Sequence, residues 1–201
     1  MDSDARWEEI IAAASATFLK NGYEATSLQD IASAVGILKG SIYYYIKAKE
    51  DLLFEIVDRA QELYLTTLDE DAELRTAPAP VRLSGFIRRW MLLTKKQQDW
   101  NTVAERSFDR LSPERLQLVI ERRDQISNFV KGIIDQGVRE GNFDPSVDAS
   151  LATITVFELL NHTNEWHRPE GRLSREAVAE WYARFIIRGL GGPNWDPRKD
   201  N

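Results

Sequence analysis

Hydrophobic residues recur at spacings of three and four along most of the chain, and the sequence shows no convincing alternation of the kind that β-strands produce. The first periodic segment covers residues 4–21, and Gly22 follows it at the position where glycine commonly ends a helix. Its apolar face consists of Trp7, Ile10, Ile11, Ala14 and Phe18. The pattern predicts an amphipathic helix as the first element.

Two short helical segments and a long one come next. Ser27 and Asp30 have the spacing of a capping box, which predicts a second helix that starts here and ends at Gly36. Residues 38–45 form a third segment, and a long amphipathic helix follows Lys49. Short helices separated by a glycine-containing turn are typical of a helix-turn-helix unit, whose later helix enters the major groove of DNA.

The remainder of the chain also predicts helices. A link at residues 69–80 is acidic and then rich in alanine and proline. The periodic segments after it cover residues 81–98, 101–110, 113–140, 148–167 and 174–190. We therefore expect an all-α protein of about nine helices.

The composition narrows the classes of function. The chain has 201 residues and no cysteine, which excludes disulfides, thiolate metal sites and thiol catalysis. Its longest uncharged run, residues 10–19, is about half the length that a bilayer-spanning helix requires. The N-terminus is acidic where a secretion signal would be basic. We expect a cytoplasmic protein with no membrane partner.

The charge distribution singles out one segment. A formal net charge of −6 argues against a general affinity for nucleic acid. However, no acidic residue occurs between residues 31 and 48, and Lys39, Lys47 and Lys49 lie in or just beyond this window. An acidic protein can place such a window against phosphates.

The residues of this window suit DNA contact. Lys39, Gly40 and Ser41 open the third segment with a cation, a residue without a side chain and a hydroxyl. The three tyrosines at residues 43–45 cannot all face one core at 100° per residue, so at least one should be exposed. Lys49 starts the fourth helix, where its ammonium and the free N–H groups together favour a phosphate.

Residues 25–52, which read ATSLQDIASAVGILKGSIYYYIKAKEDL, closely resemble the DNA-binding segment of the TetR family of bacterial repressors. A weaker similarity to that family occurs at residues 137–145, before the eighth predicted helix. Two positions depart from the family pattern: Leu38 replaces the usual Ser or Thr, which removes a side-chain cap, and Ile46 replaces the usual Phe. The resemblance implies a double-stranded DNA operator as partner. The expected DNA-contacting residues are Thr26, Ser27, Lys39, Gly40, Ser41, Tyr43, Tyr44 and Lys49.

The resemblance also implies a division of labour along the chain. We expect a helix-turn-helix DNA-binding domain over residues 1–50, a ligand-binding and dimerisation domain over residues 51–191, and a disordered tail over residues 192–201.

The eighth and ninth predicted helices are unusually apolar, and such helices need cover on every side. Core packing accounts for part of this, and the resemblance implies that the two helices also pair with a second copy as a four-helix bundle. Two-fold pairing would present two recognition helices about 34–36 Å apart, which predicts a near-palindromic operator. The expected interface residues are Ile154, Phe157, Trp181 and Phe185.

The middle helices should then enclose the site of a small-molecule effector. Residues 100–115 and 159–172 are similar to the actinobacterial branch of the family that governs sterol and fatty-acid breakdown, which implies an acyl-CoA thioester as effector. The expected effector-binding residues are Trp90, Trp100, Arg106, Arg123, His162 and Trp166. For Arg123, a surface residue whose charged end reaches solvent, or an interface ion pair, remains the alternative to a counter-charge for an anionic ligand.

Two other function classes compete with a DNA-binding regulator. An enzyme has little support, because His162 and His167 are spaced so that they do not share a helical face for a metal, and no nucleotide-binding or nucleophile motif occurs. We expect no catalytic residue, no metal and no cofactor. A helical protein-interaction module without DNA binding is the second alternative. The operator sequence, and repression as against activation, stay open.

Overall fold

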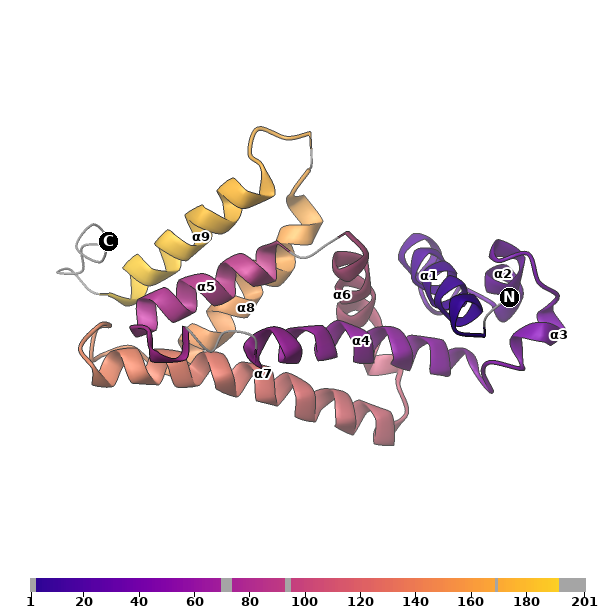
Figure 1. Ribbon diagram of the computed structural model, residues 1–201, viewed down its shortest axis with the longest axis horizontal. Coiled ribbons are helices and arrows are strands. Elements are labelled where there is room, and N and C mark those ends of the chain that lie inside the picture. The colour runs from indigo at the N-terminus through magenta and orange to yellow at the C-terminus, as the bar shows by residue number, and fades with distance from the viewer. Residues whose placement is uncertain (1–2, 70–73, 93–94, 169, 192–201) are drawn as a thin grey trace. The chain divides into compact units, whose positions relative to one another are not determined.

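The computed structural model describes residues 3–69, 74–92, 95–168 and 170–191, and every regular element in these ranges is a helix (Figure 1). This confirms the all-α prediction. The α-helices are α1 (Ser3–Asn21), α2 (Leu28–Ala34), α3 (Lys39–Ile42), α4 (Lys49–Asp69), α5 (Ala79–Met91), α6 (Lys95–Ser107), α7 (Pro113–Arg139), α8 (Ala149–Trp166) and α9 (Arg175–Leu190). Two short 3₁₀-helices are η1 (Leu74–Thr76) and η2 (Phe108–Arg110). The predicted disordered tail at residues 192–201 lies outside the described residues.

Three predicted boundaries were wrong: the end of the third segment, the end of the fifth helix and the start of the sixth, which begins at Lys95 and not at residue 101. The third segment is an α-helix only over Lys39–Ile42, and the tyrosines that follow lie in a turn in which the Tyr45 N–H donates to the Ile42 carbonyl at 3.0 Å. The helix predicted over residues 81–98 ends at Met91, where the Leu92 N–H donates to the carbonyls of both Arg88 and Arg89. Periodicity alone did not reveal this second end, because no glycine or proline marks it.

The chain divides into two compact units. Unit 1 combines Met1–Leu63 with Thr94–Arg123, and unit 2 combines Tyr64–Leu93 with Asp124–Asn201. Unit 1 therefore contains α1, α2, α3 and most of α4 together with α6, η2 and the start of α7. The functional division at residue 50 stays a prediction.

The core of unit 1 is built from apolar faces of six helices. Its α1 residues are among those that helical spacing placed on one face, and Ile10, Ile11 and Ala14 are fully buried. Ile42 and Ile46, on either side of the tyrosine turn, are 0% and 4% exposed. The smaller isoleucine at residue 46 therefore still anchors the connection from α3 to α4. The other buried members include Ile31, Ala32, Leu52, Leu53, Ile56, Val57, Val103, Ala104, Leu111 and Val119.

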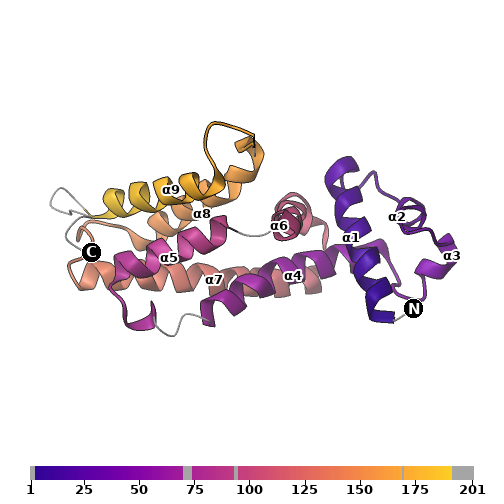
Figure 2. The same cartoon turned by 45° about the horizontal axis from the view of Figure 1, so that its top comes forward.

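The core of unit 2 forms where α5 packs along α9, as both views show (Figures 1 and 2). The ring of Trp90 on α5 lies 5.5 Å from that of Phe86 and 5.1 Å from that of Phe157 on α8. The predicted break before α8 is confirmed: Gly141 has φ +74°, and Phe143 turns back onto α7. A Cβ atom on Gly137 would lie 2.3 Å from the Phe143 ring, so only glycine fits under it.

A search of the described residues for a membrane-crossing helix found none with the required length and apolarity.

Candidate nucleic-acid interface

Local hydrogen bonds set both ends of α2. The Asp30 N–H donates to the Ser27 hydroxyl at 3.2 Å and the Ser27 N–H donates to the Asp30 carboxylate at 2.8 Å, which confirms the predicted capping box. These bonds hold the pKa of Asp30 below its ordinary value. Gly36 adopts φ +69°, and the next N–H, that of Ile37, donates to the Ala32 carbonyl at 2.9 Å. The chain thus turns sharply out of α2 and into α3.

Residues 38–46, which we call the α3 segment, present most of their polar and aromatic side chains to solvent. Because Ile42 and Ile46 point into the core, Lys39 and Gly40 are exposed, and the side chains of Tyr43 and Tyr44 are 52% and 89% exposed. Ser41 is half-buried, and Tyr45 packs on the core of unit 1. The structure therefore brings the α3 residues of the predicted DNA-contacting set together on one short segment.

Leu38 occupies the N-cap position of α3 and makes no side-chain capping bond, as its departure from the usual Ser or Thr predicts. Its side chain is 81% exposed.

Thr26 and Ser27 are engaged within the protein. Thr26 is 2% exposed, and its hydroxyl donates to the Gly22 carbonyl at 2.8 Å. The Ser27 hydroxyl is exposed but donates to the Asp30 carboxylate at 2.7 Å. Both residues shape the turn between α1 and α2, and their contact with DNA stays a prediction.

Lys49 has a structural role that sequence reasoning missed. Its ammonium donates to the carbonyls of Tyr23 at 2.6 Å and Thr26 at 2.8 Å, reaches the Glu24 carbonyl at 3.4 Å, and lies 4.3 Å from the centre of the Tyr23 ring. It thereby ties the α1–α2 turn to the first turn of α4. The contact of Lys49 with a phosphate stays a prediction.

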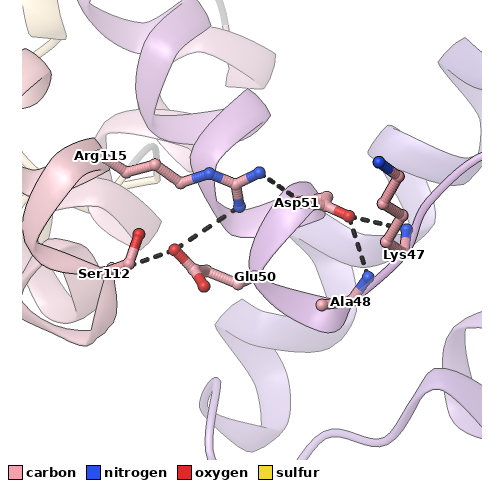
Figure 3. Close-up of polar contacts among 6 residues, drawn as sticks. All are labelled: Lys47, Ala48, Glu50, Asp51, Ser112 and Arg115. Carbon is pink, nitrogen blue, oxygen red and sulfur yellow. Dashed lines mark hydrogen bonds and ion pairs between the residues drawn. The ribbon is translucent and has the colours of Figure 1, made fainter.

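A second tie joins the start of α4 to the start of α7 (Figure 3). The Ser112 N–H donates to the Glu50 carboxylate at 2.9 Å, and the Arg115 guanidinium lies between Glu50, at 3.5 Å, and Asp51, with which it forms a short hydrogen bond. The other oxygen of Asp51 accepts from the N–H groups of Lys47 at 2.7 Å and Ala48 at 2.9 Å. We call these contacts the Arg115 bridge.

The Arg115 bridge stabilises charged carboxylates. The hydrogen bond from the Ser112 N–H holds the pKa of Glu50 below its ordinary value. For Asp51, partial burial alone raises the pKa, but hydrogen bonds from Arg115, Ala48 and Lys47 outweigh burial and leave the pKa below its ordinary value. Both groups are therefore charged at neutral pH.

The same two helices carry another ion pair farther along. Asp58 on α4 and Arg122 on α7 approach to 2.5 Å, and each lies seven residues after its counterpart in the Asp51–Arg115 pair. A seven-residue repeat on two helices keeps the contact on one seam when they run parallel. Within unit 1, the start of α7 is thus held against α4 over about two turns.

The comparisons with known proteins agree with this architecture. Residues 10–56 match the model of the bacterial regulatory proteins of the tetR family, and residues 76–190 match that of the tetracyclin repressor-like C-terminal domain. The chain belongs to the tetR family.

Several relatives of this tetR-family chain cover nearly its full length. The HTH-type transcriptional repressor KstR2 of Mycobacterium tuberculosis is 26% identical over 188 residues, which are 93% of this chain and 94% of that protein. The crystal structure of the TetR family transcriptional regulator PfmR from Thermus thermophilus is 31% identical, with a TM-score of 0.81, over 90% of this chain and 98% of that one. AibR, in a crystal structure with isovaleryl coenzyme A and operator DNA, is 25% identical, with a TM-score of 0.77, over 94% of this chain and 99% of that one.

The Arg115 bridge joins the two matched segments of this tetR-family chain. Glu50 and Asp51 belong to the N-terminal match, whereas Ser112 and Arg115 belong to the C-terminal match. All four residues lie within unit 1. The DNA-binding helices therefore share a compact unit with a part of the C-terminal module.

Neither unit holds all six predicted effector-binding residues. In unit 1, Trp100 is half-buried with the Arg59 guanidinium 5.7 Å from its ring, Arg106 is exposed, and the exposed Arg123 lies with its guanidinium 4.6 Å from the Phe108 ring. Arg106 also lines a cavity of about 310 Å³ between the end of α1 and α6, together with Arg110.

The other three predicted effector residues lie in unit 2. Trp90 is 8% exposed within the core, whereas His162 and Trp166 are exposed and one turn apart on α8. The Nδ1 atom of His162 lies 3.0 Å from the Glu158 carbonyl oxygen. The roles of all six residues stay predictions.

The predicted dimer-interface residues lie on α8 and α9, which contact each other in unit 2. Ile154, Trp181 and Phe185 are 58%, 51% and 53% exposed, and the rings of Trp181 and Phe185 stack at 4.9 Å. Phe157 instead is half-buried and packs on the core. Leu151, which is 64% exposed, adds to the apolar surface of α8.

Replacing Arg115 with methionine should lower the free energy of unfolding by about 1–2 kcal/mol at pH 7, because both carboxylates of the bridge lose their cation while staying partly exposed. Their folded-state pKa values are depressed, so the stability they contribute is present above the unfolded pKa and is lost as the pH falls through the folded pKa. The difference between R115M and the native chain should therefore shrink below about pH 4. Urea unfolding at pH 7 and pH 3 measures it.

The matched control is Lys131→Met, which removes an exposed ion pair to Asp135 at 2.9 Å on the same helix. It should change the stability by less than about 0.5 kcal/mol. Equal losses in the two variants at pH 7 would contradict a special role for the Arg115 bridge.

Proposed function

We propose that this chain is a ligand-responsive transcriptional repressor that binds a near-palindromic operator as a dimer and releases it when a small-molecule effector binds. The observation that carries the proposal is the α3 segment, whose buried Ile42 and Ile46 turn Lys39, Tyr43 and Tyr44 outward within the match to the tetR family. A positively charged recognition helix of this kind suits the major groove, which is wide enough to admit it.

The charge distribution supports DNA as the partner despite the acidic whole. The net charge of −6 disfavours unspecific adsorption to a duplex, whereas the window at residues 31–48 carries lysines and no acid. Binding would then depend on a small number of lysine–phosphate contacts at a defined site. Such contacts release counterions, so the affinity should fall steeply with salt.

Operator DNA lies in the cytoplasm, and we propose that the protein works there as a regulator and not as an enzyme. A helical interaction module without DNA binding is the second candidate, and the salt dependence of DNA binding separates the two. The similarity to KstR2, a transcriptional repressor, supports repression over activation.

Replacing Lys39 or Lys49 with glutamine tests the DNA contacts on a duplex that carries the promoter of this chain's own gene. Lys39 is exposed, so K39Q should reduce the slope of log affinity against log salt by about 1.8 for a dimer while the unfolding temperature stays unchanged. K49Q should weaken binding to all sequences alike and also lower the unfolding temperature, because it frees the carbonyls of the α1–α2 turn. Fluorescence anisotropy across a salt series measures both. An affinity that does not depend on salt would favour the interaction module.

We propose that α8 and α9 form the dimer interface. These two contacting helices carry large apolar side chains that are half or more exposed. In a two-fold dimer, the same surface of a second copy can cover them. The two-fold axis would then place two α3 segments for adjacent major grooves.

Trp181→Glu should yield a monomer, because it places a charge in the middle of this apolar surface. Trp181 is half exposed, so the subunit should stay folded. Native mass spectrometry should show a single copy, and operator affinity should fall about 100-fold or more as the second half-site is lost. Leu92→Glu, at a 46% exposed leucine outside α8 and α9, is the control and should stay dimeric. A W181E dimer would contradict this interface.

We propose an acyl-CoA thioester as the effector. KstR2 of Mycobacterium tuberculosis is described as a ketosteroid transcriptional regulator, and AibR has been crystallised with isovaleryl coenzyme A and operator DNA. The candidate effector contacts remain the six residues expected from the sequence, which are Trp100, Arg106 and Arg123 in unit 1 and Trp90, His162 and Trp166 in unit 2. The arginines suit phosphate groups, and the tryptophans suit an apolar group. The effector must bind two conformations of the dimer with different affinity in order to release DNA.

Operator affinity measured with and without saturating isovaleryl-CoA, oleoyl-CoA and free CoA tests the effector class. At least one acyl-CoA should weaken operator binding by about tenfold or more, within the usual range of coupling between two sites, and free CoA should not. Operator affinities that all equal the affinity without ligand would contradict these two acyl-CoA thioesters as effectors and leave DNA binding untouched.

A further inference from the structure

Leu38 is the residue of the α3 segment whose presence the fold does not explain. Leucine is a poor N-cap, and Leu38 makes no capping bond. Its neighbours Val35 and Ile37 pack against the core of unit 1, whereas the Leu38 side chain is 81% exposed. A residue that is unfavourable for the local structure and gains no packing contact in return indicates a functional role.

The position of Leu38 is that of a base-reading residue. It lies at the N-terminal end of α3, and the first residues of a recognition helix are those that contact base edges. The next two residues, Lys39 and Gly40, are exposed as well, so the start of α3 lies at the surface of unit 1. Residues 31–48 contain no acidic side chain, so none of them would repel the phosphates of the DNA on either side of the groove.

The chemistry of a leucine side chain limits what it can read. It neither donates nor accepts a hydrogen bond, so it cannot distinguish the polar edges of guanine, adenine or cytosine. The apolar group that the major groove offers is the C5-methyl of thymine. The neighbours of Leu38 are Ile37, which packs on the core of unit 1, and Lys39, which is charged, so the leucine by itself is too small an apolar surface for a protein partner.

We propose that Leu38 contacts the methyl group of one thymine in each operator half-site and thereby selects thymine at that position. The inference rests on the proposed function, since it requires that α3 enters the major groove. Leu38 would then determine specificity at a position where Ser or Thr would instead cap the helix or contact a phosphate.

Deoxyuridine isolates the methyl group, because it pairs as thymine does and lacks only the C5-methyl. The operator is first selected from a random duplex library with the full-length chain. Each thymine of the selected duplex is then replaced by deoxyuridine, one at a time and in symmetric pairs. One position per half-site should show about fourfold weaker binding, and about 15-fold weaker binding when both copies are replaced.

Two variants assign that sensitivity to Leu38. Leu38→Ser restores a good N-cap, so its unfolding temperature should stay the same or rise, while its affinity ratio between thymine and deoxyuridine should fall to one at that position. Leu118→Ser, at a 50% exposed leucine on α7, is the matched control and should keep the native ratio at every position. A loss of stability cannot imitate this result, because it would lower both affinities together.

Three outcomes would overturn the inference. A native chain that binds thymine and deoxyuridine equally everywhere has no methyl contact. A ratio that survives in L38S belongs to another residue. A selected operator without a preferred thymine in its half-sites would offer no methyl group for Leu38 to contact. If no duplex is selected, the proposed function falls with the inference, whereas in the other cases only the inference falls.

Discussion

The α3 segment has only four helical residues, and a helix of that length has no stability of its own. Its orientation depends on the burial of Ile42 and Ile46, which are 0% and 4% exposed. With these two side chains in the core of unit 1, the helix leaves Lys39 and Gly40 in solvent, and the turn after it leaves Tyr43 and Tyr44 in solvent. The exposed part of the α3 segment therefore depends on two apolar contacts, and a polar side chain at either position would release it.

The first turn of α4 connects this surface to the rest of unit 1. Lys49 bonds to the carbonyls of the α1–α2 turn, and two residues later Asp51 bonds to both Arg115 and the N–H groups that precede α4. One helical turn thus touches the turn before α2, the end of the α3 segment and the start of α7. In the proposed function, a shift of α7 would reach the DNA surface through the carboxylate of Asp51, because the same carboxylate holds the backbone before α4.

Most of the fold could be predicted from the sequence, because its signals are local. The capping box at Ser27 and the break at Gly141 each depend on residues a few positions apart, and both are present as predicted. The end of α5 could not be predicted, since no glycine or proline marks it. The contacts of Lys49 and Arg115 could not be predicted either: their partners lie 23 to 65 positions away, and several are backbone groups that no side-chain pattern reveals. The tertiary fold alone brings them together.

Exposed apolar side chains occur on α8 and α9 and at Leu38. Their surroundings differ, and so do the partners that they favour. On α8 and α9 they are several, large and on contacting helices, so together they form a surface that only another apolar surface can cover. At Leu38 a single side chain follows a glycine turn and precedes a lysine, so any partner must accept one small apolar group beside a cation. A polyanion whose groove carries isolated methyl groups meets that condition, and the face of a second protein subunit does not. The same physical property therefore supports self-association at one end of the chain's sequence and base selection at the other.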